Sequence, residues 1–377
     1  MKTPVKPILL ALTCLIATLN SQLSTAFAQG SLTPPGAPAP TFKTLAQIEP
    51  RTPIGTNTTP GDADSLFKIT QPGSYYLTTN LTGVAAKHGI EIAVGGVTLD
   101  LMGFELAGGV TNSLDGVRVS LSVIVTNLAI RNGSVRNWGG DGVDAINAAN
   151  GQYQDLRLSA NGGRGLFCGA GSAVVNCAAT FNTGDGINVS SGSTVSGSTA
   201  QGNTGRGIVA VLGSTVSGCA ATFNTGDGIV AGHGSTVSGC AARGNTGDGI
   251  SAGTGSTVTG CTATFNTGDG IQVSSDCRVT DNTCDSNGDG GDGAGIHATG
   301  TDNRIEGNNV TDNDRGIDVD STGNFIIRNS ASGNTTNWDV VAGNVILVVN
   351  ATTAAAVLGS SGGTAPGSTD PNANFSY

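Results

Sequence analysis

The sequence predicts an all-β protein: a single-stranded right-handed parallel β-helix, or β-solenoid, with about 11–12 coils of about 21 residues. The first observation is a repeat in which the apolar residue that closes each unit recurs every 21 residues. These residues are Leu166, Ile187, Ile208, Ile229, Ile250 and Ile271. The second is the alternation of apolar and polar residues within a unit, as at Ile187, Val189 and Val195, which is typical of strands with one buried face.

Looser units flank the regular ones. Their closing residues are Ile90, Val117 and Val143 on one side and Ile296 and Ile317 on the other. Insertions in a solenoid fall in turns, so the unequal spacing does not interrupt the stack. Hydrogen bonds between successive coils satisfy each strand and leave open edges only at the two ends. We therefore expect a β-helix with its N-terminal cap over residues 61–349 and a flexible C-terminal tail over residues 350–377.

The N-terminus has the features of a secretory signal peptide over residues 1–28. Lys2 and Lys6 supply positive charge, an apolar stretch follows, and Ala26-Phe27-Ala28 provides a cleavage site. That stretch is too short to cross a bilayer, so no membrane span is predicted. Residues 29–60, rich in Pro, Thr and Ala, are predicted to be a linker. We therefore expect a secreted protein, located outside the cell or in the cell envelope.

Composition restricts the partners. The formal net charge is −10 at pH 7, and no lysine occurs after Lys87. Nucleic acids and anionic membranes are bound through clustered lysine and arginine, so a nucleic-acid partner is excluded. We expect a monomer.

Stacking places equivalent residues above one another, so each position of the repeat becomes a column. Asparagine forms the clearest column, in which stacked amides hydrogen-bond to one another and support a tight turn. Its members are Asn161, Asn182, Asn203, Asn224, Asn245, Asn266 and Asn287, continued by Asn313 and Asn334. A second column contains Cys177, Cys219, Cys240 and Cys261. We interpret these cysteines as small core residues rather than as a metal or redox site.

A third column lies between two turn glycines and carries charge. It runs Asp141, Arg164, Asp185, Arg206, Asp227, Asp248 and Asp269. Its first five members alternate in sign, which is typical of surface ion pairs. The last three place like charges about 5 Å apart, which is unfavourable unless something neutralises them. Asp227, Asp248 and Asp269 are therefore candidate ligands for Ca²⁺, and screening by water and salt is the alternative.

The column that points outward beside the buried Ile and Val residues varies more. In the last coils, His297 is predicted to stack on Asp318, with Asp320 on the same face. An imidazole beside two carboxylates can perform general acid–base catalysis, so these three are the candidate catalytic residues. An exposed polar patch without activity is the alternative. Candidate substrate-binding residues from the same column are Gln272, Arg118, Glu91 and Asp144.

A column of hydroxyl groups completes the set. It consists of Thr194, Thr215, Thr236 and Thr257 beside Ser196, Ser217, Ser238 and Thr259. Such residues suit any exposed strand. A flat, regular hydroxyl face also allows binding to ice or another crystal surface.

The coils resemble the pectin-lyase-like superfamily of right-handed parallel β-helix repeat proteins. The phrases "PGSYYLTTNL", "GIEIAVGGVTLDLMGFEL" and "IRNGSVRNWGGDGV" in particular resemble a group of exported bacterial β-helix proteins of unassigned activity. The resemblance implies the fold, export and a role connected with polysaccharide. It does not extend to the enzymes' motifs: Gly232-His233-Gly234 reproduces the GHG of polygalacturonases, but no RIK or paired DD accompanies it. Candidate aromatic residues for stacking on sugars are Trp138, Trp338, Tyr153 and Phe167.

The sequence therefore predicts a secreted β-helix protein that binds or acts on extracellular or cell-surface polysaccharide. If the protein is an enzyme, it is expected to be a polysaccharide lyase or a glycoside hydrolase. A non-catalytic structural or adhesive surface protein is the main alternative, and binding to ice or a crystal surface is a further one. A cofactor other than Ca²⁺ is not predicted.

Overall fold

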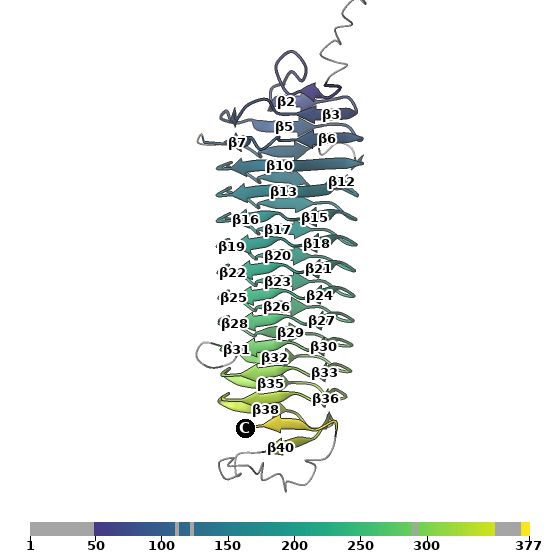
Figure 1. Cartoon of the computed structure of the whole chain (residues 1–377), viewed down its shortest axis with the longest axis vertical. Helices are drawn as coiled ribbons and strands as arrows, with labels where there is room; N and C mark the ends of the chain where they lie inside the picture. The colour runs from purple at the N-terminus through teal and green to yellow at the C-terminus, as the bar shows by residue number, and fades with distance from the viewer. Residues whose placement is uncertain (1–48, 110–112, 121–123, 289–290, 292, 351–370) are drawn as a thin grey trace, which may run out of the picture. The chain divides into compact units, whose positions relative to one another are not determined.

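The computed structural model describes residues 49–109, 113–120, 124–288, 291, 293–350 and 371–377. The described residues from Arg51 onward form one compact unit, a stack of coils in which strands of successive coils pair in parallel (Figure 1). No α-helix occurs in the described residues, which confirms the all-β prediction. These residues also contain no helix long and apolar enough to cross a membrane.

One strand of every coil contributes to a thirteen-stranded sheet. Its members in spatial order are β2 (Ser65–Ile69), β5 (His88–Ile92), β8 (Val117–Val119), β11 (Val143–Ala145), β14 (Leu166–Cys168), β17 (Ile187–Val189), β20 (Ile208–Ala210), β23 (Ile229–Ala231), β26 (Ile250–Ala252), β29 (Ile271–Val273), β32 (Ala294–Ala298), β35 (Arg315–Val319) and β38 (Thr336–Val340). The thirteen coils counted by this sheet exceed the 11–12 predicted from the sequence, because the prediction did not include the coils of β2 and β38. In these strands Phe67 and Trp338 occupy the position that Ile, Val or Leu holds elsewhere, so the repeat is hidden in the sequence.

The other strands of the coils form a twenty-six-stranded sheet. Its members are β1 (Thr52–Pro53), β3 (Gly73–Tyr76), β4 (Leu81–Thr82), β6 (Val97–Asp100), β7 (Glu105–Ala107), β10 (Leu128–Arg136), β13 (Gln152–Ser159), β15 (Ala173–Val175), β16 (Ala178–Thr180), β18 (Thr194–Ser196), β19 (Thr199–Gln201), β21 (Thr215–Ser217), β22 (Ala220–Thr222), β24 (Thr236–Ser238), β25 (Ala241–Arg243), β27 (Thr257–Thr259), β28 (Thr262–Thr264), β30 (Arg278–Thr280), β31 (Thr283–Asp285), β33 (Arg304–Glu306), β34 (Asn309–Thr311), β36 (Phe325–Ile327), β37 (Ser330–Ser332), β39 (Val345–Ile346), β40 (Val348–Asn350) and β41 (Asn374–Ser376). Strands β9 (Val125–Thr126) and β12 (Ala148–Ala149) form a separate pair.

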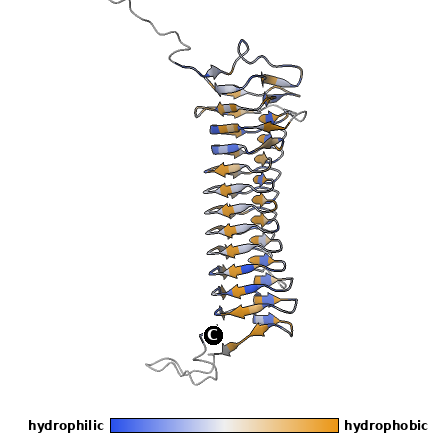
Figure 2. Ribbon diagram, turned by 90° about the vertical axis from the view of Figure 1, so that its right-hand side faces the viewer, coloured by the Kyte–Doolittle hydropathy of each residue, from blue (hydrophilic) through white to orange (hydrophobic). Residues whose placement is uncertain are grey.

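The core is a column of small and branched side chains that runs through the stack. In one coil Ile187, Val195 and Ala200 are all fully buried, and more exposed residues alternate with them along the strands. Hydrophobic segments recur in coil after coil along the stack (Figure 2). The asparagine column is confirmed. Asn203 Nδ2 donates to Asn224 Oδ1 of the next coil at 2.9 Å and to the carbonyl oxygen of Ala179 in the preceding coil at 3.1 Å. The cysteine column is buried as predicted, and the seven cysteines of the described residues are free thiols.

Two predicted boundaries differ from the structure. Strand β1 lies inside the predicted linker 29–60, because Thr52 and Pro53 pair with Tyr75 and Tyr76 of β3. Strand β41 lies inside the predicted flexible tail 350–377 and pairs with both β37 and β40. The residues that carry the predicted signal peptide lie outside the described part of the chain.

Candidate functional sites

Three exposed phenylalanines form a column at one turn of the solenoid. Phe181, Phe223 and Phe265 each follow the last strand before the asparagine turn, and they are 66%, 55% and 55% exposed. They occur in every second coil, separated by Gly202 and Gly244 at the same position. We call Phe181, Phe223 and Phe265 the phenylalanine column. Sequence reasoning did not single it out, although the phrase "ATFNTGDGI" occurs three times.

The backbone at this turn is left-handed. Phe181, Phe223 and Phe265 have φ of 56°, 55° and 57°, a region that suits Gly or Asn and is unfavourable for a bulky side chain. A large apolar side chain there gains little from burial, because more than half of it faces solvent. Folding therefore does not explain why phenylalanine occurs three times at this position, which points to a function for the exposed rings.

The intervening glycines make room for the rings. A Cβ added to Gly202 would lie 2.7 Å from the Phe181 ring, and one added to Gly244 would lie 2.7 Å from the Phe223 ring. The rings of Phe181 and Phe223 therefore lie across the bare backbone of the next coil. The guanidinium of Arg243 lies 5.8 Å from the Phe223 ring centre and 5.3 Å from that of Phe265, within range of cation–π attraction. The exposed surface along this turn therefore consists of the three phenylalanine rings and the positive charge of Arg243.

The predicted catalytic residues come together on the adjacent strands β32 and β35. His297 pairs in register with Asp318, its Nε2 lies 3.0 Å from Asp320 Oδ2, and the Nε2–Asp318 Oδ2 distance is 3.9 Å. The structure adds a fourth residue, because His297 Nδ1 lies 2.7 Å from Asp269 Oδ2. We call His297, Asp269, Asp318 and Asp320 the histidine cluster. Arg315 donates to Asp318 Oδ2 at 2.6 Å.

The carboxylates of the histidine cluster stabilise the protonated, positively charged form of His297. The hydrogen bond to Asp269, its charge, and then the contacts with Asp320 and Asp318 together raise the pKa of His297 to about 9, against the opposing effect of burial. Both ring nitrogens face carboxylates at neutral pH, so neither is a free base. The side chains meet as predicted, while their catalytic role stays a prediction.

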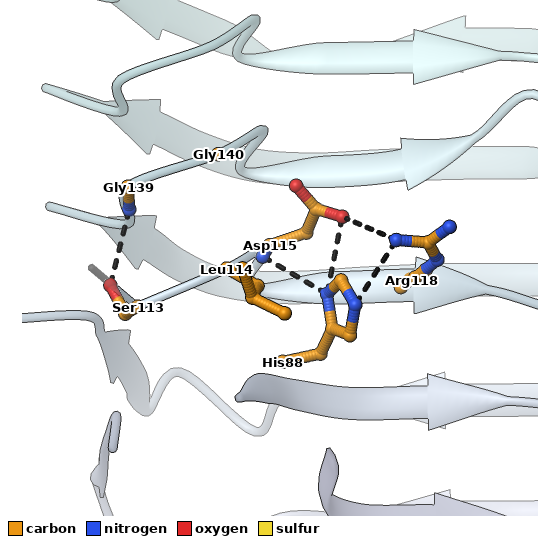
Figure 3. A pocket seen from close by; sticks show the side chains of 7 residues that line it. All are labelled: His88, Ser113, Leu114, Asp115, Arg118, Gly139 and Gly140. Atoms are coloured by element: carbon orange, nitrogen blue, oxygen red, sulfur yellow. Dashed lines mark hydrogen bonds and ion pairs between the residues drawn. The ribbon is translucent and has the colours of Figure 1, made fainter. Parts of the chain in front are cut away.

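A pocket of about 420 Å³ lies among the first coils (Figure 3). It is lined by His88, Ser113, Leu114, Asp115, Arg118, Gly139 and Gly140. His88 Nδ1 lies 3.2 Å from Asp115 Oδ2, and its Nε2 lies 3.1 Å from Nη1 of Arg118. Arg118 can only donate, so Nε2 accepts its hydrogen bond, and the backbone N–H of Asp115 lies 3.1 Å from Nδ1. His88 and Asp115 belong to the same column as Asp141, but the column predicted from the sequence began two coils too late to include both.

The other candidate substrate-binding residues have different surroundings. Arg118 lines the pocket, and Asp144 pairs in register with it on β11. Burial raises the pKa of the Asp144 carboxyl, with the nearby charge of Asp115 acting in the same direction. Glu91 is buried against Ser65 and Lys68, at 2.9 and 3.0 Å. Gln272 lies far along the stack, where its Nε2 is 3.4 Å from Asp269 Oδ2. Glu91, Arg118 and Asp144 are thus in register on the adjacent strands β5, β8 and β11, whereas Gln272 lies apart from them.

The structure adds backbone hydrogen bonds along the charged column. Asp227 Oδ1 accepts a hydrogen bond from the backbone N–H of Asp248 at 3.0 Å, and Asp248 does the same for Asp269 at 2.9 Å. Asp185 likewise accepts from the backbone of Arg206. Within the described part of the chain, one group of three metal-binding side chains has its ligand atoms within 4.8 Å of one another, and it is His297, Asp318 and Asp320 rather than Asp227, Asp248 and Asp269.

The remaining predictions can be located in the structure. The threonine column is in register from Thr194 to Thr257 and is bounded by Ala173 and Arg278. Two of the proposed sugar-stacking aromatics, Trp138 and Tyr153, are instead fully buried core residues, which excludes them as a contact surface.

Phe167 lies under Arg164, whose guanidinium is 3.9 Å from the ring centre. Trp338 is partly buried and packs against the core.

Comparison with known proteins defines the family. The model of the right handed beta helix region matches residues 78–221 and 213–361, so the chain belongs to this family. The fold is that of a right-handed parallel β-helix. No curated protein sequence matches the chain significantly.

Solved structures share the fold at low sequence identity. The A-module of the Azotobacter vinelandii mannuronan C-5 epimerase AlgE4 is 16% identical, with a TM-score of 0.55 over 78% of this chain and 89% of that one. The ORF18 protein of Geobacillus virus E2 is 14% identical, with a TM-score of 0.50 over 62% of this chain and 54% of that one. At these identities the likeness establishes the fold and nothing finer.

Proposed function

We propose that the protein is secreted and binds an extracellular or cell-surface polysaccharide along the phenylalanine column. The main support is that three exposed phenylalanine rings recur at a turn with a left-handed backbone, where burial of the rings cannot explain the choice of phenylalanine. The electron-rich face of an aromatic ring attracts the C–H groups of a sugar ring, and flat exposed rings present that face.

The spacing of the rings supports a linear ligand. Successive coils are about 4.8 Å apart, so rings in every second coil repeat at about 10 Å along the stack. An extended glycan also presents its sugar rings at a regular interval along one direction, and every second ring can meet a side chain of the column. Arg243, between Phe223 and Phe265, adds a cation that favours hydroxyl-rich or acidic sugars. A bound chain would therefore run parallel to the axis of the stack.

The structural relatives are consistent with this proposal. The epimerase module is named for an activity on mannuronan, a polysaccharide. The proposal for this chain is binding, because the described clusters of acids and bases are paired with one another. Polysaccharide cleavage by His297, Asp318 and Asp320 stays a separate hypothesis. A purely structural or adhesive surface protein would need no aromatic column.

Affinity electrophoresis of the protein through gels that contain single polysaccharides, neutral and uronate-containing, tests the proposal. Replacement of all three rings in Phe181→Asn/Phe223→Asn/Phe265→Asn should restore ordinary mobility on the retarding polysaccharide. Each ring contributes ~0.5–1.5 kcal/mol, or about 2- to 10-fold in affinity, so the triple variant should lose at least tenfold. Asparagine tolerates the left-handed turn, so the variant should retain the fold.

The matched control is Leu212→Asn, which replaces another exposed apolar residue at a different turn, with 49% of its surface exposed. This variant should bind like the parent protein. Retardation that is equal in the triple variant and the parent would overturn the proposal. Release of reducing or unsaturated sugars during the same incubation would show that the protein also cleaves its ligand.

A further inference from the structure

The histidine cluster has the composition and arrangement of a metal site. Its side chains come from neighbouring coils, with His297 on β32 and Asp318 on β35 paired in register (Figure 1). Asp320 follows two residues after Asp318, so both carboxylates project from the same face of the strand end. We propose that His297 Nε2, Asp318 and Asp320 bind a divalent transition-metal ion such as Zn²⁺, independently of polysaccharide binding at the phenylalanine column.

The distances between the three ligand atoms fit a zinc site after a small movement of the side chains. One ligand atom from each of the three side chains lies within 4.8 Å of the others. Zinc ligands at about 2.0–2.1 Å from the ion in tetrahedral geometry lie about 3.3 Å from one another. Nε2 is already 3.0 Å from Asp320 and 3.9 Å from Asp318. Asp320 is half exposed, so its side chain can move without disturbing the core. Three ligands leave one coordination position for water or a sugar hydroxyl.

Asp269 holds the imidazole in the orientation that metal binding requires. Its carboxylate can only accept a hydrogen bond, so the His297 Nδ1 atom 2.7 Å away carries a proton and donates it. Nε2 then points at Asp318 and Asp320. A carboxylate behind a ligating histidine fixes its tautomer and increases its basicity in many metal sites. Asp269 is itself held by the backbone N–H of Ala294, at 2.7 Å. Asp269 and the backbone of Ala294 thus orient His297 without being metal ligands themselves. An ion pair on the protein surface does not require such an orienting group.

The charge balance also favours a cation. Three carboxylates, Asp269, Asp318 and Asp320, surround one imidazole. The guanidinium of Arg315 contacts Asp318 at 2.6 Å but is shared with Asp339 at 3.3 Å. It contacts the same Asp318 oxygen, Oδ2, that faces His297, and one guanidinium does not offset the charge of all three carboxylates. A divalent ion would replace the Nε2 proton and neutralise the remainder.

The ligand types select the metal. Calcium takes six to eight oxygen ligands, and an imidazole is a poor one. A nitrogen and two carboxylate oxygens suit zinc and its neighbours in the first transition row. The site therefore differs in position and in metal from the calcium site predicted on Asp227, Asp248 and Asp269, and Asp269 serves it as a positioning residue.

Isothermal titration of the chelator-treated protein with ZnCl₂, repeated with CaCl₂, tests the proposal. We expect one equivalent of zinc to bind and calcium not to compete. His297→Ala should weaken zinc binding by at least 100-fold. Asp269→Asn should weaken it by about 10- to 100-fold, the usual effect of losing the group behind a ligating histidine. His233→Ala removes an exposed histidine elsewhere and should leave the affinity unchanged.

The buried thiols require a second measurement, because cysteine also binds zinc. X-ray absorption at the zinc edge should show nitrogen and oxygen neighbours and no sulfur. Cys240→Ser should bind zinc like the parent protein. Sulfur in the coordination shell, unchanged affinity in His297→Ala, or no binding by the parent would each overturn the proposal. Polysaccharide retardation should be the same in His297→Ala and the parent, so this proposal and the binding function fail separately.

Discussion

At the residue scale, the aspartates of the charged column join neighbouring coils through the backbone. Asp227 and Asp248 each use one carboxylate oxygen to accept the N–H of the equivalent residue one coil on. An amide oxygen can accept the same hydrogen bond. The negative charge is thus not required for this contact. At Asp248 it is unfavourable, because burial and then the charges of Asp269 and Asp227 raise the pKa of the carboxyl to about 6.

Asp248→Asn should therefore stabilise the protein at pH 7. A raised carboxyl pKa means that the folded state binds the proton more tightly, so the stability it confers is present below pH 3.8 and lost as pH rises through about 6. The amide cannot lose a proton and keeps the hydrogen bond to Asp269. With EDTA present, we expect a higher melting temperature at pH 7, corresponding to on the order of 1 kcal/mol after solvent screening. The gain should vanish near pH 4.

Calcium provides the contrasting outcome for this column. If Asp227, Asp248 and Asp269 hold Ca²⁺, adding calcium should raise the melting temperature of the parent protein and not that of Asp248→Asn. The variant would then be the less stable of the two in calcium. Equal melting curves with calcium and with EDTA would leave the backbone hydrogen bonds as the whole role of these aspartates.

At the element scale, the asparagine column connects the turns of the coils. Asn224 donates to Asn245 Oδ1 at 3.0 Å and to the carbonyl of Ala200, and it accepts from both the backbone and the side chain of Asn203. Each member satisfies buried groups on both neighbouring coils. Loss of one member therefore leaves unsatisfied groups on both sides.

Asn224→Ala should destabilise the protein by about 2–4 kcal/mol, since it leaves two or more buried donors and acceptors without partners. Urea-induced unfolding followed by circular dichroism measures the loss. Because each coil contacts only its neighbours, amide hydrogen exchange should accelerate most in the coils around β20 and β23. Thr225→Ala, at the next position of the same turn, is the control and should change stability little. Uniform acceleration along the whole stack would contradict this local effect.

The columns differ in how far the sequence could predict them. The isoleucine and asparagine columns were predictable, because 21-residue spacing fixes the register and buried side chains leave a clear periodic pattern. The phenylalanine column shares that spacing, but its significance depends on a left-handed backbone that the sequence does not display. Asp269 was assigned to calcium because its contact with His297 crosses a coil of irregular length. Trp138 was misassigned because a lone aromatic carries no periodic signal of burial.

At the scale of the whole molecule, the open end of the stack is closed by residues that are distant in sequence. Asn374 of β41 continues a second asparagine column: Asn329 donates to Asn374 Oδ1 at 2.9 Å from both its backbone and its side chain. Strand β41 also pairs with β37 and with β40, and Asn374 is fully buried. The final seven residues are therefore part of the solenoid's C-terminal edge.

Deletion of residues 371–377 should expose that edge. The deletion removes the partners of Asn329 and uncovers the unpaired backbone of β37, a parallel strand edge that can pair with another chain. We expect a lower melting temperature and concentration-dependent association, measured by light scattering coupled to size-exclusion chromatography. Asn374→Ala should reproduce the loss of stability with less association, because the strand remains in place. Phe375→Ser, which alters an exposed side chain of the same strand, is the control. A deletion variant with unchanged melting temperature and mass would show that β41 does not protect this end.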